Sequence, residues 1–130
     1  MSDLDDLKAA FAHLAQALAA RDLDSLATLW HEQIVTFQPF SPFAVEGKAA
    51  QRQVFGALFE NSEVIGGAPI NPQFRIVGDV GIVWGHFALA IKPKDGPLRT
   101  SFVRSTFTFT KIDGKWVELV VHHSLIPSGN

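Results

Sequence analysis

The sequence has 130 residues, of which 47% are hydrophobic and 18% are charged, and its formal net charge is −2 at pH 7. A chain of this size and apolar content buries a sizeable core, so we expect one domain over residues 1–130 and exclude disorder. The lack of cysteine excludes disulfides, thiolate nucleophiles and Cys-based zinc sites. Its weak acidity, the absence of a membrane-length apolar segment and the absence of a leader pattern indicate a cytoplasmic protein that binds neither nucleic acid nor membranes.

The first half of the chain is predicted to be mainly helical. Leucine and phenylalanine recur at steps of three and four over residues 3–20, which predicts a helix that Ser2 caps. Asp22 precedes a second short helix that reaches Trp30, and residues 47–61 form a third. We therefore expect three helices in this half.

The second half is predicted to consist mainly of strands. One strand is expected earlier, over residues 33–40, before a proline-containing loop. The later strands are expected at residues 73–77, 80–92, 98–111 and 115–125. Their hairpin connections predict an antiparallel sheet, and helices followed by strands predict an α+β fold with the helices on one sheet face.

Alternation along the late strands assigns their side chains to two faces. Phe107 shares its face with Ser105, and Val117, Leu119, Val121 and His123 are assigned to the corresponding inner face of the last strand. The opposite face is predicted to hold Trp84, His86, Arg104, Thr106, Glu118 and His122. Strand 80–91 is apolar on both sides, which indicates that both faces are covered. Since the helices cover only one face, we predict a homodimer that buries the other.

Two stretches resemble a known family. The run from Asp22 to Glu32, followed by Pro39 and the segment 45–48, resembles the opening of SnoaL-like and ketosteroid isomerase-like domains of the nuclear transport factor 2-like superfamily. The run from Arg104 to Ser124 is similar to the end of SnoaL-like proteins and to the association domain of calcium/calmodulin-dependent kinase. The resemblance implies a cone-shaped curved sheet around the helices, with one deep apolar pocket and dimerisation through the outer sheet face.

The chemistry of the isomerases does not carry over to this chain. The resemblance places Gln38 where the isomerases have a basic aspartate, and an amide has no useful basicity. It places Leu14 and Ser105 where they have oxyanion-hole donors, and the chain has no tyrosine. It also places Phe107 and His123 where the kinase domain has pocket arginines. We therefore expect neither steroid isomerisation nor an anion-binding pocket.

The pocket predicted from the resemblance and the alternation is apolar with few polar groups. Its expected ligand-binding residues are Leu14, Leu18, Gln38, Phe40, Phe55, Phe59, Phe87, Ser105, Phe107, Phe109, Val121 and His123. Bulky apolar walls with Gln38 and His123 as polar groups favour a small apolar or aromatic ligand. The main hypothesis is therefore a small-molecule binding protein.

Two alternatives stay open. One is an enzyme of isomerase, cyclase or dehydratase type with His123 as its acid and base, since only imidazole changes charge near neutral pH. The other is a structural association domain. No cofactor and no metal site are predicted, because the adjacent His122 and His123 project to opposite faces of a strand and cannot share one ion.

Overall fold

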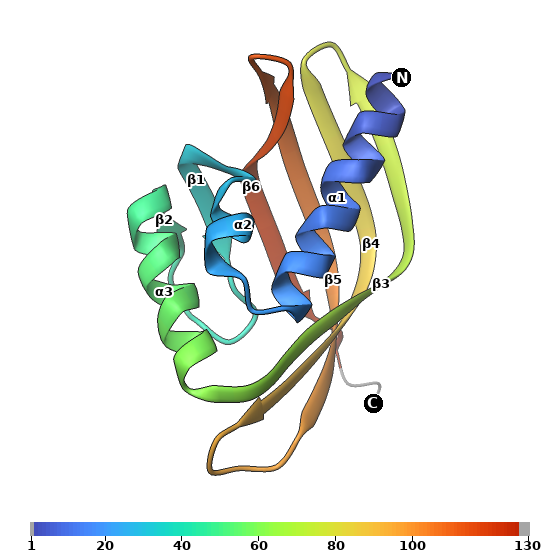
Figure 1. Cartoon of the computed structure of the whole chain (residues 1–130). Coiled ribbons are helices and arrows are strands. Elements are labelled where there is room, and N and C mark those ends of the chain that lie inside the picture. The colour runs from blue at the N-terminus through green and yellow to red at the C-terminus, as the bar shows by residue number, and fades with distance from the viewer. Residues whose placement is uncertain (1, 128–130) are drawn as a thin grey trace.

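The computed structural model describes residues 2–127, in which three helices pack on one face of a six-stranded sheet (Figure 1). The helices are α1 (Asp3–Ala19), α2 (Leu23–Ala27) and α3 (Lys48–Glu60). The strands are β1 (Trp30–Phe37), β2 (Val45–Glu46), β3 (Ser62–Val77), β4 (Val80–Pro93), β5 (Arg99–Ile112) and β6 (Lys115–Leu125). The predicted α+β class, with a curved sheet around the helices, is confirmed. None of the helices in the described residues is long and apolar enough to cross a membrane.

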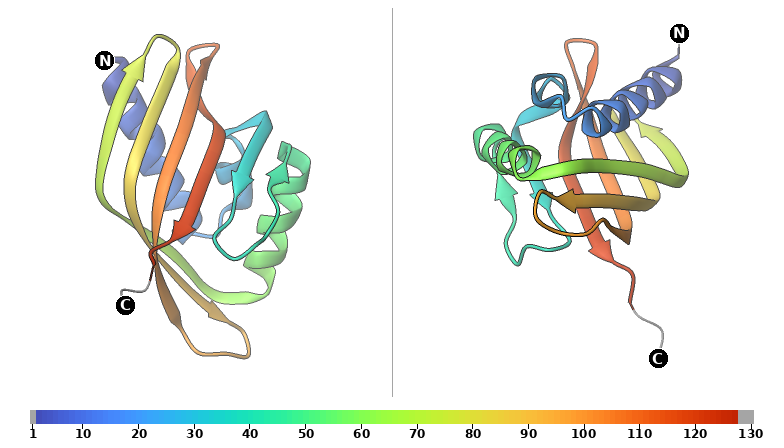
Figure 2. Two further views of the ribbon diagram at one scale, coloured as in Figure 1. Left: turned by 180° about the vertical axis from the view of Figure 1, so that it is seen from behind. Right: turned by 60° about the horizontal axis from the view of Figure 1, so that its bottom comes forward.

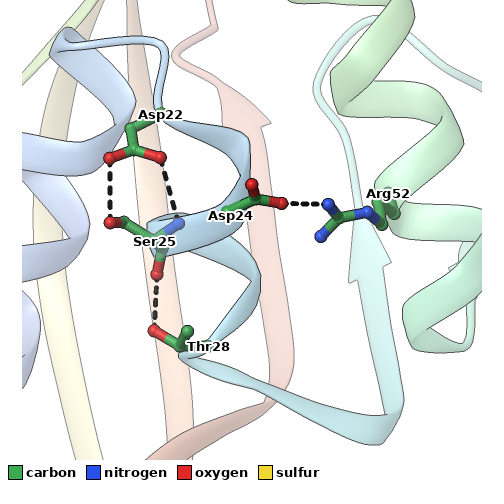
Figure 3. Close-up of polar contacts among 5 residues, drawn as sticks. All are labelled: Asp22, Asp24, Ser25, Thr28 and Arg52. Atoms are coloured by element: carbon green, nitrogen blue, oxygen red, sulfur yellow. Dashed lines mark hydrogen bonds and ion pairs between the residues drawn. The ribbon is translucent and has the colours of Figure 1, made fainter.

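Side-chain caps determine where the first two helices begin. The Ser2 hydroxyl accepts a hydrogen bond from the Asp5 amide at 3.1 Å, and acidic residues in the first turn of α1 suit the helix dipole. The Asp22 carboxylate accepts from both the amide and the hydroxyl of Ser25, which starts α2 (Figure 3). Because α2 ends at Ala27, Trp30 belongs to β1, whereas the sequence predicted that the helix would reach it.

The third helix is tied to the second by an ion pair. Arg52 of α3 contacts the Asp24 carboxylate of α2 on the exposed side of both helices (Figure 3). The chain enters α3 through Gly47 at φ 91°, a left-handed conformation that favours glycine. These features place the inner side of α3 against the sheet.

The strand order is β2-β1-β6-β5-β4-β3, and β1 is parallel to β6 while the other pairs are antiparallel. The parallel pair departs from the predicted antiparallel sheet. The parallel pair forms because β1 and β6 are far apart in the chain and are not joined by a hairpin, so they can run in the same direction side by side. Seen from behind, the sheet face opposite the helices has no described element over it (Figure 2, left).

The sheet is strongly curved along β3, which bends as it runs from the end of α3 to the far edge of the sheet (Figure 2, right). The sequence predicts a strand only at residues 73–77 in this region, whereas β3 begins at Ser62. Prolines are tolerated in β3 because it is the edge strand. Its register against β4 shifts between Ile70 and Gln73, opposite Gly85 at φ 152°, and a side chain on Gly85 would crowd the β3 backbone.

A second irregularity lies in β6 and changes which side chains face the helices. Thr108 pairs with Val120, but the next residue of β5, Phe109, pairs with Glu118. One additional residue, Leu119, is therefore accommodated in β6 as a bulge. The bulge inverts the alternation, so Trp116 and Glu118 are buried on the same side as Val121. The prediction that Val117 and Leu119 occupy that inner face is wrong for this reason.

Candidate functional site

A cavity of about 440 Å³ is lined by residues of the three helices and of the sheet. Its wall is mostly apolar and is formed by Leu14, Leu18, Leu26, Trp30, Phe40, Val54, Phe55, Ala57, Leu58, Ile65, Gly66, Phe87, Leu89, Ile91, Phe107 and Val121. The polar residues that line it are Thr36, Gln38, Ser41, Gln51, Asn61, Glu118 and His123. Phe40, Ser41 and Asn61 are exposed, so they mark the mouth of the cavity.

Most of the residues predicted to contact a ligand lie on this wall. They are Leu14, Leu18, Gln38, Phe40, Phe55, Phe87, Phe107, Val121 and His123. They come from α1, the end of β1, α3 and three strands of the sheet, so only the folded chain brings them together.

Three predicted contact residues do not line the cavity. Phe109 is fully buried in the packed core, where its ring fills space instead of bordering it. The Ser105 hydroxyl is hydrogen-bonded to the His123 ring, and of these two residues only His123 lines the wall. Phe59 packs edge-on against Phe55 with ring centroids 5.9 Å apart and borders a separate shallow depression with Arg21 and Lys94. The sequence prediction did not distinguish these residues from the cavity wall, because strand parity and helix periodicity identify an inward face without separating packed core from open space.

The largest correction concerns Glu118, which was predicted to lie on the outer sheet face. The β6 bulge turns this residue inward, where it is 3% exposed and lines the cavity. Burial raises the pKa of its carboxyl to about 8, because the charged form loses its hydration. Glu118 is therefore a neutral carboxylic acid at pH 7, able to donate a hydrogen bond.

Two further buried polar side chains line the same cavity. Thr36 of β1 and Gln51 of α3 are each 2% exposed. The atoms Thr36 Oγ1, Gln51 Oε1 and Glu118 Oε1 have no hydrogen-bond partner within the part of the chain that the structure describes. Buried polar atoms are nearly always paired in proteins, so three such atoms on one cavity wall need an explanation.

His123 is held in the cavity wall by neighbours on two strands. Its Nδ1 lies 2.7 Å from the Ser105 hydroxyl, and the rings of Phe107 and Phe87 lie 5.4 and 6.4 Å from the imidazole. Burial, with a smaller contribution from His122, lowers its pKa to about 4. The imidazole is consequently neutral at pH 7, and Nε2 is the ring nitrogen left for another partner.

The other residues assigned to the outer face do lie on it. Trp84, Thr106 and His122 are opposite one another across β4, β5 and β6, and His86 pairs with Arg104 in the adjacent row. All of these except the partly buried Trp84 are exposed. Phe37 extends the first row by stacking on His122 at 5.1 Å. The described residues contain no group of three or more His, Asp or Glu side chains arranged to hold a metal ion.

Sequence reasoning missed Thr36, Gln51 and Glu118 as cavity residues, although signals for two of them were present. Thr36 precedes Gln38 by two residues and therefore shares its face of the strand. Gln51 is four residues before Phe55 on the same helix face. The position of Glu118 depends on the bulge, which simple alternation ignores.

Comparison with known proteins gives one family match and many fold matches. Residues 7–128 match the sequence model of the SnoaL-like domain, and no curated protein matches the chain. An NTF2-like family protein of Streptomyces avermitilis, provisionally named a dehydratase, is similar at 19% identity, with TM-score 0.87 and 97% and 98% of the two chains covered. A provisional calcium/calmodulin dependent protein kinase II association domain of Xanthomonas campestris has 21% identity, TM-score 0.85 and 99% and 91% coverage. A ketosteroid isomerase-like protein of Erwinia carotovora atroseptica has 18% identity, TM-score 0.81 and 98% coverage of each chain. At these identities, the structural likeness establishes the fold.

Proposed function

This chain belongs to the SnoaL-like family of the NTF2-like superfamily, and from that premise we propose that it binds a small, uncharged apolar or aromatic molecule in the cavity. The observation that supports this proposal most strongly is the cavity itself. Its volume of about 440 Å³ lies in the range of small-molecule sites, which are mostly apolar with a few placed polar groups. A neutral ligand fits because no arginine or lysine lines the described wall.

The polar groups near the mouth suit orientation of such a ligand. Gln38 directly follows β1 and His123 lies on the adjacent β6, since the last residue of β1, Phe37, pairs with His122. A neutral imidazole fixed by Ser105 at 2.7 Å presents one hydrogen-bonding nitrogen in a constant orientation. Its pKa of about 4 makes it a weak base at pH 7. The structure therefore favours binding over the alternative with His123 as a proton carrier.

Blocking the cavity provides the test. Leu58→Trp places an indole into the space between α3 and the sheet, because Leu58 lines the cavity. We expect the affinity for N-phenyl-1-naphthylamine, a neutral dye that fluoresces in apolar sites, to fall by about tenfold or more, which is about 1.4 kcal/mol. Gln53→Trp is the control, since Gln53 is exposed on the same helix and does not line the cavity. Absence of dye binding by the unmodified protein, or equal loss in both variants, would contradict the proposal.

We also propose that the exposed face of the sheet pairs two copies of the chain. Phe37, Phe102 and Val120 are 43%, 54% and 37% exposed, although large apolar side chains on a sheet face are usually covered. Arg75 lies over the Trp84 ring at 5.3 Å, which adds the aromatic and arginine content common at interfaces.

Light scattering during size-exclusion chromatography tests the pairing. We expect the mass of two chains at micromolar concentration and the mass of one for Val120→Glu, because that change places a charge in the covered face. Leu4→Glu introduces the same charge at a leucine that is 39% exposed on α1, the helix on the other side of the sheet, and should remain dimeric. A monomeric unmodified protein would refute the homodimer.

A further inference from the structure

The inner part of the cavity carries polar side chains that the proposed apolar contacts leave unused. Thr36, Gln51 and Glu118 come from β1, α3 and β6, and all three are at most 3% exposed. Each lines the cavity and has a side-chain oxygen without a partner among residues 2–127. Leaving a buried polar group unpaired destabilises the folded protein. A ligand group that pairs with these oxygens would recover part of that cost.

The chemistry of the three groups specifies what such a ligand group must do. The Gln51 carbonyl oxygen only accepts hydrogen bonds, whereas the Thr36 hydroxyl both donates and accepts. The Glu118 carboxyl is neutral at pH 7 and donates through its own proton. A partner for this set must therefore give one hydrogen bond and take another, which a hydroxyl group does. A carboxylate only accepts, and its charge would be buried without a cation on the described wall.

We propose that Thr36, Gln51 and Glu118 form the inner recognition site for an uncharged hydroxyl, so that the ligand is a phenol or an apolar alcohol bound hydroxyl end first. This inference rests on the proposed binding function and names the class of its ligand. The hydroxyl donates to Gln51 Oε1 and accepts from the Glu118 carboxyl or Thr36. The apolar body then lies against Trp30 and Phe55, whose rings are 5.4 Å apart.

The inner site is distinct from the polar groups at the mouth. Glu118 and His123 are separated by four ladder positions of β6, because Leu119 is the extra residue of the bulge. At ~3.3 Å per residue this is roughly 13 Å, so a two-ring molecule reaches one of them at a time. Thr36 pairs with Val121 and therefore lies between the two positions. Variants at the inner site and at Gln38 consequently separate the two contributions.

Competition between matched probes tests the inference. 2-Naphthol and 2-methylnaphthalene have nearly the same shape, and each is used to displace N-phenyl-1-naphthylamine at pH 6.5. We expect 2-naphthol to bind about tenfold more tightly than 2-methylnaphthalene, as one or two additional buried hydrogen bonds would give. We expect 2-naphthoate to bind more weakly than both. In Thr36→Val and Glu118→Leu the preference for the hydroxyl should fall to about twofold or less, whereas Gln38→Leu should keep it.

The outcomes separate this inference from the proposed function. If the dye and 2-methylnaphthalene bind but 2-naphthol has no advantage, the hydroxyl site is wrong and the apolar pocket stands. If Gln38→Leu removes the preference while Thr36→Val keeps it, the hydroxyl is recognised at the mouth and the inner site is also wrong. If no probe binds, both proposals fail. Thr36→Val is nearly isosteric, so it keeps the test valid even if Glu118→Leu does not fold.

Discussion

The stability of this protein should decrease by about 2 kcal/mol between pH 6.5 and pH 8, and Glu118→Gln should abolish the decrease. Burial raises the pKa of Glu118 from 4.5 to about 8, so the folded state retains a proton that the unfolded state has already released. Between those pH values stability falls as pH rises, with a slope of at most about 1.4 kcal/mol per pH unit. Urea denaturation at a fixed protein concentration measures the effect.

His123 has the opposite effect on stability at lower pH, below about 6.5. Its pKa is lowered from 6.5 to about 4, so the unfolded state binds the proton first and stability rises with pH between those values. The two slopes oppose each other from pH 4.5 to 6.5, and only the loss from Glu118 continues up to pH 8. We therefore expect a plateau followed by a decline in the unmodified protein, and a rise followed by a plateau in Glu118→Gln.

Glu63→Gln is the control for this pH profile. The Glu63 carboxylate is exposed and its pKa is lowered by Lys92, so its contribution is lost only at acidic pH. The decline above pH 6.5 should therefore persist in Glu63→Gln. A flat profile from pH 6.5 to 8 in the unmodified protein would show that Glu118 is not a buried acid.

Phe109→Ala should destabilise the fold far more than Phe55→Ala. Phe109 is fully buried on β5, and removing a large core side chain costs about 3–5 kcal/mol through lost transfer energy and a new cavity. Phe55 is only partly buried and already borders the cavity. Its loss enlarges an existing space, so we expect about 1–2 kcal/mol. Chemical denaturation of both variants measures the difference.

The same pair of variants separates core from binding site in function. Phe55→Ala should weaken binding of N-phenyl-1-naphthylamine because it removes part of the cavity wall, whereas folded Phe109→Ala should retain it. Equal destabilisation by the two substitutions would show that the wall near α3 is packed as tightly as the core. In that case the cavity would not be a site for a two-ring molecule.

The faces of β5 show why alternation succeeds where a strand is regular. Val103, Ser105, Phe107 and Phe109 are all buried and Arg104 is exposed, as period-two spacing predicts. Counting residues along β5 and β6 away from the Asp113-Gly114 turn that joins them pairs Lys111 with Trp116 and Phe109 with Glu118, as observed. Counting from the Ser105–His123 pair gives the opposite parity for Glu118. Each count is correct on its own side of the bulge, but the Ser105–His123 pair is known only from the structure, so the count from the turn alone does not reveal the bulge.

The sequence alone determined the helices, the hairpins, the family resemblance and part of the apolar cavity wall, because those depend on local spacing and side-chain type. Only the tertiary structure decided that Glu118 enters the cavity and that Phe109 and Phe59 do not line it. It also decided that β1 joins β6 in parallel. The physical reason is that register shifts and the boundary between packed core and open space arise from contacts between distant segments, and no local pattern encodes them.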